Sequence, residues 1–164
     1  MVTACSLWTD GWEPSCPERH KVYFSIGSNI GNRKGLVREA VKRLGSEVGP
    51  VKAFSSLYET EPWGFTSPNK FINACACCLT TLTPRQVLQT TQRIERCMGR
   101  TQKTVDGAYH DRVIDIDILF YDDLRIDEPG LCIPHPRMAE RAFVMDPLRE
   151  IWPGGEDALR RLLP

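Results

Sequence analysis

Long apolar runs are missing from this 164-residue sequence. No stretch approaches the roughly 20 apolar residues that a helix needs to cross a bilayer, and the N-terminus lacks the basic start and apolar block of a signal peptide. Neither sign of charge is in excess, because 21 Lys and Arg residues balance 21 Asp and Glu residues. This balance argues against the uniformly basic surface that drives non-specific binding to nucleic acid. We therefore expect a cytoplasmic protein with no membrane or nucleic-acid partner, in which any phosphate site is local.

A second pair of closely spaced cysteines is also missing, although the chain has seven cysteines. Cys75 and Cys78 form a C-x-x-C, but they lie in an extended apolar run from Phe71 to Leu79, where cysteine acts as a small core residue. A zinc site needs about four suitably spaced ligands. Reduced core thiols are therefore favoured, and a redox or zinc motif is the minor alternative.

The common nucleotide-binding motifs are absent. No G-x-x-x-x-G-K-[ST] occurs, and Gly27-Ser-Asn-Ile-Gly31 does not match G-x-G-x-x-G. The protein-kinase signatures are absent as well. If the chain acts on ATP, it must hold the nucleotide in another way.

Strand and helix patterns alternate along the chain. Residues 1–20 have neither period and are expected to form an irregular N-terminal extension, and 21–164 are expected to form a single domain. The predicted elements are a strand at 22–26, a helix after the turn at 27–31, strands at 51–58 and 71–82, a helix from 84 to about 98, a strand at 112–122 and a final helix at 156–163. Their order predicts an α+β ferredoxin-like sandwich, with a mostly antiparallel sheet and helices packed on it.

Capping signals fix the starts of the two main helices. Asn32 is a plausible N-cap of the first helix. Thr83-Pro-Arg-Gln86 combines an N-cap Thr, a Pro at N1 and a capping-box Gln at N3, and Gly99 offers a C-terminal stop. Glu95 lies in the apolar stripe of this second helix, an unusual place for a carboxylate.

Two carboxylates on the last long strand are the main candidates for chemistry. The period of two places Asp115 and Asp117 together on one face. Paired carboxylates repel unless a cation lies between them, and oxygen ligands shared with phosphates suit Mg²⁺. Taken alone, the pair is more typical of a half-buried strand with a solvated acidic face, because D-x-D is common on strands. The opposite face is predicted to carry Ile114, Ile116, Ile118 and Phe120.

Cationic residues surround this strand in the sequence. Arginine forks match phosphate oxygens that a metal alone would leave uncompensated, so a metal and phosphate site would explain both signs of charge. Each arginine alone is equally typical of a solvated surface residue, and a lone histidine is more often a structural hydrogen-bonding group than a catalyst. The residues are Arg100, Lys103, Arg112, His135, Arg137 and Arg141.

Short motifs follow one another in a fixed order: Ser25-Ile-Gly-Ser-Asn29, Tyr58-Glu-Thr-Glu-Pro62, Phe71-Ile-Asn73, Gln92-Arg-Ile-Glu-Arg96 with Gly99-Arg100, Asp111-Arg-Val-Ile-Asp-Ile-Asp117, and Pro134-His135 leading to Arg141-Ala-Phe143. Each motif is short, but their joint order and spacing are highly specific. From about Lys21 to Pro153 the sequence resembles the 6-hydroxymethyl-7,8-dihydropterin pyrophosphokinases of folate biosynthesis.

The resemblance implies a Mg²⁺-dependent transferase, a kinase that moves pyrophosphate from its co-substrate ATP to 6-hydroxymethyl-7,8-dihydropterin and releases AMP. It implies two Mg²⁺ ions with Asp115 and Asp117 as ligands, and catalytic roles for these two residues, Arg100 and Arg112. The implied ATP-binding residues are Gln92, Glu95, Arg100, Tyr109, Arg112, His135 and Arg141. The implied pterin-binding residues are Thr60, Pro62, Trp63, Phe71, Asn73 and Phe143.

Some positions depart from the family pattern. Gln102 and Lys103 stand where many relatives carry a second Arg, and Tyr109 stands where a Trp is common. The segment from Gly99 to Asp111 is polar with few apolar anchors, so we expect a loop that is mobile until substrates bind.

Two rival functions remain open at this stage. One is another ATP:Mg phosphoryl or nucleotidyl transferase, which would release a different nucleotide product. The other is a non-catalytic ferredoxin-like nucleotide-binding module, which would leave the Asp pair unexplained. Association with other folate-pathway enzymes is a further expectation.

Overall fold

The computed structural model describes residues 17–101 and 109–164, so 1–16 of the expected extension and 102–108 of the expected mobile loop lie outside the described residues. In chain order the elements are β1 (His20–Ser28), α1 (Arg33–Glu47), β2 (Val51–Phe54), β3 (Tyr58–Thr60), β4 (Phe71–Thr80), α2 (Pro84–Cys97), β5 (Asp115–Tyr121), β6 (Ile126–Glu128), β7 (Leu131–Ile133), a 3₁₀ turn (Met138–Glu140), α3 (Ala142–Ile151) and α4 (Gly155–Leu162).

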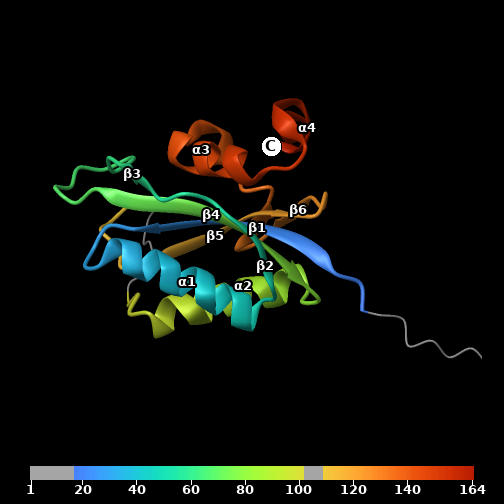
Figure 1. Cartoon of the computed structure of the whole chain (residues 1–164), viewed down its shortest axis with the longest axis horizontal. Coiled ribbons are helices and arrows are strands. Elements are labelled where there is room, and N and C mark those ends of the chain that lie inside the picture. Colours follow the sequence, from blue (N-terminus) through green and yellow to red (C-terminus); the bar gives the residue numbers. More distant parts are fainter. Residues whose placement is uncertain (1–16, 102–108) are drawn as a thin grey trace, which may run out of the picture.

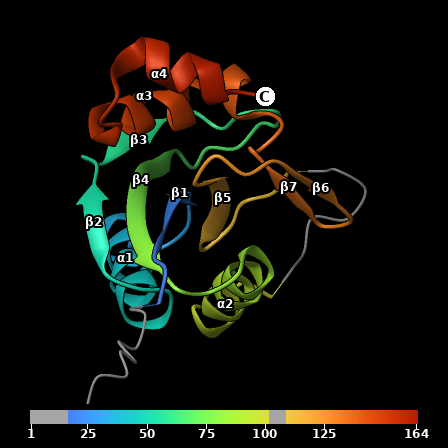
Figure 2. The same ribbon diagram turned by 90° about the vertical axis from the view of Figure 1, so that its right-hand side faces the viewer.

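One antiparallel sheet forms the centre of the described residues, in the order β2-β4-β1-β5, with β3 also paired to β4. The connections β1-α1-β2 and β4-α2-β5 each skip one strand, which places α1 and α2 on the same face. Helices α3 and α4 cover the opposite face (Figures 1 and 2). Strands β6 and β7 form a separate hairpin. The predicted α+β class with an antiparallel sheet and packed helices is confirmed.

Strand β1 is buried on both faces and separates two hydrophobic clusters. Val22, Phe24 and Ile26 belong to the cluster under α1 and α2. Tyr23 and Cys75 belong to the cluster under α3 and α4. Because side chains alternate along a strand, β1 contributes to both cores, and it is buried from Val22 to Ser28.

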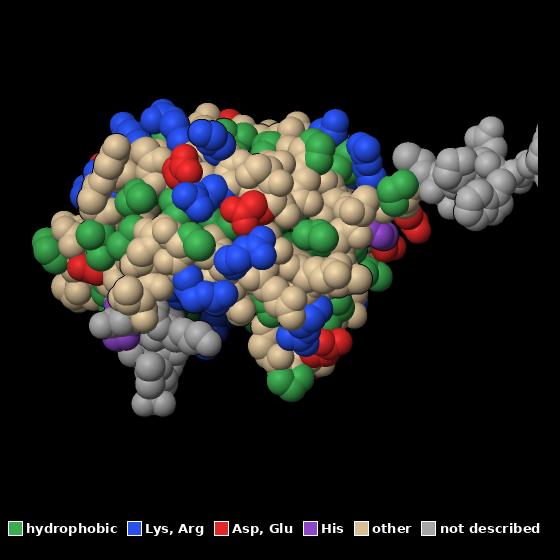
Figure 3. Space-filling view, turned by 90° about the horizontal axis from the view of Figure 1, so that it is seen from below, with side chains coloured by type: hydrophobic (Ala, Val, Ile, Leu, Met, Phe, Trp, Pro, Cys, Tyr) green, Lys and Arg blue, Asp and Glu red, His purple; other side chains and the backbone are tan. Residues whose placement is uncertain are grey.

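Both predicted helix caps are present. The Asn32 side chain accepts a hydrogen bond from the Gly35 amide at 3.2 Å. Thr83 and Gln86 form the reciprocal capping box, at 3.3 Å and 2.9 Å. The outer face of these two helices carries side chains of both charge signs (Figure 3), and Arg93 of α2 pairs with Glu47 of α1 at 2.9 Å.

The predicted strand at 51–58 is wrong in one respect, because it is broken into β2 and β3. The break lies at Ser55, whose side chain is buried. The Ser55 hydroxyl accepts a hydrogen bond from the Cys75 amide at 2.9 Å, and the Ser55 amide donates to the Cys75 carbonyl at 2.9 Å. The Cys75 amide thus bonds to the Ser55 hydroxyl instead of a backbone carbonyl of the neighbouring strand, and the chain changes direction before β3.

The predicted face of Phe120 is also wrong. Tyr23 pairs with Phe120 but Phe24 pairs with Ile118, so one residue, Leu119, is extra on β5. Such a β-bulge moves the residues beyond it to the other face. Phe120 therefore packs under α3 and α4, with its ring 5.3 Å from that of Trp152. Ile114, Ile116 and Ile118 lie in the cluster under α1 and α2, as predicted.

The cysteines of β4 are free thiols in the core. Cys75, Cys77 and Cys78 are buried, and burial raises the pKa of the Cys78 thiol to about 12. In the described ranges no three His, Cys, Asp or Glu residues form a group that could hold a metal ion. Nor does any helix of those ranges have the length and apolarity to cross a membrane. Small core residues are the interpretation that fits these cysteines.

Candidate active site

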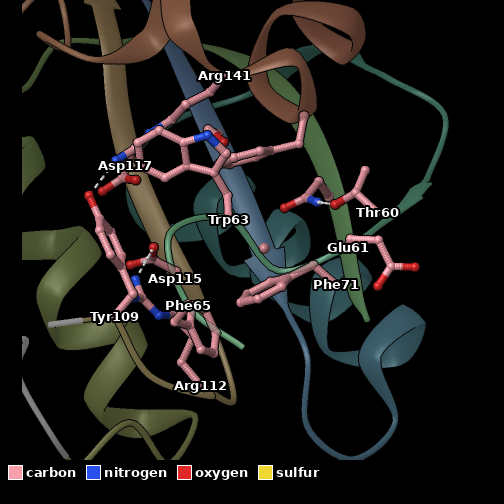
Figure 4. Close-up of a pocket in the computed structure, with 14 residues that line it drawn as sticks. Thr60, Glu61, Trp63, Phe65, Phe71, Tyr109, Arg112, Asp115, Asp117 and Arg141 are labelled. Carbon is pink, nitrogen blue, oxygen red and sulfur yellow. Dashed lines mark hydrogen bonds and ion pairs between the residues drawn. The ribbon is translucent and has the colours of Figure 1, made fainter. Parts of the chain in front are cut away.

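Asp115 and Asp117 lie at the start of β5, beside the end of β1. The register pairs Gly27 with Asp115 and Ser25 with Asp117. Because Ile116 between them faces α1 and α2, both carboxylates face the side of the sheet that α3 covers. Figure 4 shows the two side chains projecting from one strand into a cavity. The sequence prediction that they share a face is confirmed.

Asp115 is held by two arginines from different segments. Arg100, which follows α2, donates to its Oδ1 at 2.6 Å, and Arg112, just before β5, donates to its Oδ2 at 2.6 Å. Arg100 also donates to Glu95 at 2.7 Å. These charge-assisted hydrogen bonds place two guanidinium groups at the carboxylate pair. Residues 100 and 112 are thereby brought together, as the phosphate-site hypothesis requires.

Asp117 and Glu95 have raised pKa values. Burial, and next the charge of Asp115, raises the pKa of Asp117 to about 7. Burial and Asp115 likewise raise the pKa of Glu95 to about 7, although Arg100 acts in the opposite direction. A cation between Asp115 and Asp117 would offset the repulsion from Asp115, which is the second cause of the raised pKa of Asp117 after burial. The donor set fits Mg²⁺, because two carboxylates leave most ligand positions for water and substrate oxygens.

Glu95 connects α2 to β5. Its carboxylate accepts a hydrogen bond from the Ile116 amide at 2.7 Å, which explains its place in the apolar stripe of the helix. Glu95 lines a groove that also contains Gln92 on the same helix face. The complete lining is Leu88, Thr91, Gln92, Glu95, Arg96, Arg100, Thr101, Asp115, Ile116, Asp117 and Gly130.

A second cavity, here called the aromatic cavity, has five aromatic side chains in its lining. It adjoins this groove and shares Asp115 and Asp117 with it. Within it, the Asn73 amide donates to the Thr60 hydroxyl at 2.6 Å (Figure 4). The lining residues are Ser25, Gly27, Thr60, Glu61, Trp63, Phe65, Phe71, Asn73, Tyr109, Arg112, Asp115, Asp117, Arg141 and Phe143.

Arg141 contacts two aromatic side chains of this cavity, Trp63 and Tyr109. Its guanidinium lies 4.8 Å from the Trp63 ring centroid and donates to the Tyr109 hydroxyl at 3.0 Å. Its Nε is buried and has no hydrogen-bond partner among the described residues. A buried donor without a partner is costly, and a phosphate oxygen would satisfy it.

His135 is neutral at physiological pH. Burial, and next the charge of Arg141, lowers its pKa to about 4. Its amide donates to the Leu119 carbonyl at 3.1 Å, and its Nδ1 accepts from the Arg137 amide at 3.3 Å. A neutral imidazole can act here as a hydrogen-bonding group, while a charged one is disfavoured.

A hydrogen-bonded cluster fixes the backbone just before β5. The Asn29 side chain accepts from the Arg112 amide and donates to Asp111, both at 2.7 Å. Asn69 donates to the other oxygen of Asp111 at 2.9 Å. Hydrogen bonds from Ser67, Asn29 and Asn69 lower the pKa of Asp111. The cluster ties the segment that carries Arg112 to the loop that carries Trp63.

Comparison with known proteins identifies the family. The family model for 7,8-dihydro-6-hydroxymethylpterin-pyrophosphokinase (HPPK) matches residues 23–153. The chain belongs to this family. It is 47% identical over 133 residues to a 2-amino-4-hydroxy-6-hydroxymethyldihydropteridine pyrophosphokinase of Porphyromonas gingivalis, with 80% of this chain and 90% of that protein covered. The resemblance inferred from the motifs is thereby confirmed.

Two longer proteins contain a similar part. The chain is 42% identical over 133 residues to a mitochondrial folate synthesis bifunctional protein of Arabidopsis thaliana, with 80% of this chain and 23% of that protein covered. It superposes on a crystal structure of Plasmodium falciparum HPPK-DHPS with a TM-score of 0.68, at 16% identity, with 91% of this chain and 44% of that chain covered. At this identity the structural match supports the fold alone.

Most of the residues that the HPPK resemblance implied lie in the two adjoining cavities. Pro62 and His135 do not line either cavity, and Gln102 and Lys103 lie outside the described residues. In the aromatic cavity, the lining residues that sequence reasoning missed are Ser25, Gly27, Glu61 and Phe65. In the groove they are Leu88, Thr91, Arg96, Thr101, Ile116 and Gly130. Ser25 and Gly27 could have been found, because they belong to a quoted motif and a central strand.

Gly27 offers a test of the aromatic cavity. A Cβ atom at Gly27 would lie 2.8 Å from Oδ1 of Asn73, so Gly27→Ala must push this carboxamide aside. The obstacle is the end of a side chain, and the fold should therefore be retained. Because a displaced amide loses its hydrogen bonds to a bound ring, we expect pterin affinity to fall by about 10-fold or more. Calorimetric titration would measure it, and unchanged affinity would remove Asn73 from the pterin site.

Proposed function

We propose that the two adjoining cavities hold the two substrates of the HPPK reaction. In this reaction the pyrophosphoryl group of ATP is transferred to the hydroxymethyl oxygen of 6-hydroxymethyl-7,8-dihydropterin, giving AMP and the pterin pyrophosphate for folate biosynthesis. The observation that carries the assignment is that Asp115 and Asp117 line both cavities. A phosphate chain from the polar groove and a hydroxymethyl group from the aromatic cavity would meet at these carboxylates.

The aromatic cavity suits a flat heteroaromatic ring. Phe71 of β4 and Phe143 of α3 both line it, and aromatic faces of this kind stack on such a ring. Asn73 can offer a donor and an acceptor to the ring edge. Thr60 holds the Asn73 carboxamide at 2.6 Å and so fixes which way it points. Pro62 precedes Trp63 and is assigned to the same site as part of its backbone.

The polar groove suits the nucleotide. Gln92 and Glu95 lie on one face of α2 and offer hydrogen bonds to the adenosine part. Arg100, Arg112 and Arg141 would meet the phosphates, because guanidinium groups match phosphate oxygens. Tyr109 accepts hydrogen bonds from Arg137 and Arg141 at 3.0 Å each and orients both. The neutral His135 would contribute a hydrogen bond.

Asp115 and Asp117 would hold Mg²⁺, and two ions are the number we propose. Bound magnesium supplies Lewis-acid polarisation of phosphoryl oxygens and lowers the proton affinity of the attacking hydroxyl. Asp115 already accepts hydrogen bonds from two guanidinium groups, so a metal ion would replace part of the positive charge at this carboxylate. Burial is the first cause of the raised pKa of Asp117 and the charge of Asp115 the second, and a bound cation would offset that repulsion.

The protein's own groups act by alignment and electrostatics. The aromatic walls fix the plane of the pterin, so that its hydroxymethyl group points towards the shared carboxylates. Arg100 and Arg112 offset the negative charge that develops on the transferred group. Closely packed aromatic side chains exclude water, which would otherwise compete as acceptor. No covalent enzyme intermediate is needed.

Association with other folate-pathway enzymes is a second part of the proposal. It is supported by the bifunctional relative, in which the matching part is joined to further sequence. A cytoplasmic location stays a prediction.

The product of ATP distinguishes this function from its rivals. Attack at the β-phosphorus transfers two phosphates together, so we expect AMP and pterin pyrophosphate in equal amounts. Incubation with MgATP and 6-hydroxymethyl-7,8-dihydropterin, followed by chromatography of the nucleotides, measures this ratio. ADP as the main product would indicate a phosphoryl transferase, and pyrophosphate would indicate a nucleotidyl transferase. Binding without metal-dependent turnover would indicate a non-catalytic module.

A further inference from the structure

A single carboxylate outside the two cavities collects hydrogen bonds from a distant part of the chain. Glu150, in the last turn of α3, accepts from the amide and hydroxyl of Ser56 through Oε1, at 2.9 Å and 2.8 Å. Its Oε2 accepts from the Tyr58 hydroxyl at 2.7 Å. These bonds lower the pKa of Glu150, with the Tyr58 bond as the largest cause. The carboxylate is therefore charged at neutral pH.

The partners of Glu150 lie at the break between β2 and β3. Ser56 follows Ser55, where the strand changes direction, and Tyr58 is the first residue of β3. Strand β3 is three residues long and ends at Thr60. Whatever fixes Tyr58 therefore also fixes Thr60, and with it one wall of the aromatic cavity.

The other end of α3 forms the facing wall. Phe143 lies in the first turn of this helix, two residues after Arg141. Phe143 and Glu150 are seven residues apart, which is two helical turns, so they lie on the same side of α3 and about 10 Å apart along its axis. One helix face thus carries a cavity wall at its start and the Glu150 carboxylate at its end.

We propose that Glu150 is a positioning residue for the pterin site, which sets the spacing between the Phe143 wall on α3 and the Thr60 wall on β3. The inference rests on the proposed function. Without this carboxylate, α3 stays packed on β4 and β3 stays paired with β4, but the hydrogen bonds that join the end of α3 to the break before β3 are lost. The spacing of the two walls is then less closely fixed, and a stacked ring loses part of its contact with one wall. The nucleotide groove is lined mainly by α2 and β5. Of the residues proposed to meet the phosphates, Arg141 adjoins the start of α3, at the end of the helix away from Glu150. Nucleotide affinity should therefore depend far less on Glu150 than pterin affinity does.

The test separates pterin binding from nucleotide binding. For Glu150→Ala, we expect the Kd of 6-hydroxymethyl-7,8-dihydropterin, measured by calorimetry with Mg²⁺ and α,β-methylene-ATP present, to rise by about 10-fold, the scale of a small misplacement in a site. The Kd of Mg²⁺ and α,β-methylene-ATP alone should change far less. Glu150→Gln should restore pterin affinity, because its Oε1 can accept from Ser56 while the Tyr58 hydroxyl turns to accept from the amide.

Tyr58→Phe provides a second variant that opens no large cavity. It removes one of the hydrogen bonds, so we expect a smaller rise in pterin Kd, and no further rise when it is added to Glu150→Ala. Glu156→Ala is the matched control. Glu156 lies on α4 and binds Arg149 of α3 at 2.9 Å, without a hydrogen bond or ion pair to the described residues of β3, so its loss should leave pterin Kd unchanged.

The outcomes that overturn the inference are distinct from failure of the proposed function. If the wild-type protein binds pterin and makes AMP while Glu150→Ala binds pterin equally well, Glu150 has no positioning role. Equal weakening of pterin and nucleotide binding would indicate general destabilisation instead. If Glu150→Gln is as weak as Glu150→Ala, the hydrogen-bonded spacing is not the cause. A wild-type protein that binds no pterin would overturn the proposed function itself.

Discussion

Asp117→Asn is expected to lower kcat by about 10²- to 10³-fold, the scale of losing one electrostatic contact to the transition state, while pterin affinity changes little. Asparagine keeps the shape of the side chain, so the aromatic walls should be undisturbed. It removes a proposed Mg²⁺ ligand, a carboxylate whose pKa burial and next the charge of Asp115 raise to about 7. The pterin contacts are assigned to Phe71, Asn73 and Phe143, which come from other elements.

Steady-state kinetics and calorimetric pterin titration on the same preparation measure both quantities. Asp127→Asn is a suitable control, because Asp127 lies on β6 and lines neither cavity of the proposed active site. It should behave as the wild-type protein does. A loss of pterin affinity in Asp117→Asn as large as the loss of kcat would mean that the two sites are misassigned, since Asp117 also lines the aromatic cavity.

Local sequence signals predicted most of the fold. The capping residues Asn32 and Thr83 act as expected, because N-caps depend on bonds to residues two or three positions away. The break at Ser55 carries no such signal, since its cause is a hydrogen bond to Cys75, twenty positions away in the chain. The bulge at Leu119 also has no local signal, because it is defined by the pairing of β5 with β1. A strict period of two cannot reveal an extra residue when both neighbours are apolar.

The candidate site divides in a similar way. Asp115 and Asp117 could be placed on one face because they share a strand. Their arginine partners followed from charge chemistry, but the specific pairing of Arg100 with Glu95 depends on how α2 meets β5. Glu150 gave no signal at all, because its partners lie more than ninety positions away. Sequence periodicity cannot predict residues whose role depends on contacts with distant parts of the chain.

Arg100→Ala should lower kcat by about 10²-fold or more, while the Kd of MgATP changes far less. In the structure Arg100 binds Asp115 and Glu95, at 2.6 Å and 2.7 Å. A cation that binds Asp115 competes with this arginine, which can then turn to the phosphates. Loss of Arg100 removes a phosphate contact and also a competitor for the metal ligand, so the two effects on ground-state affinity oppose each other. In the transition state only the lost contact counts.

This exchange of partners has its own measurable consequence. Mn²⁺ alone, a paramagnetic substitute for Mg²⁺, should bind Arg100→Ala more tightly than the wild-type protein, because one guanidinium no longer occupies Asp115. Arg93→Ala is the control, since Arg93 lies on the preceding helix α2 but pairs with Glu47 at the surface. Single-turnover rates, MgATP calorimetry and Mn²⁺ titration by electron paramagnetic resonance test the argument together. Equal losses in rate and MgATP affinity would place Arg100 in ground-state binding, and unchanged Mn²⁺ affinity would show that Arg100 and the metal do not compete for Asp115.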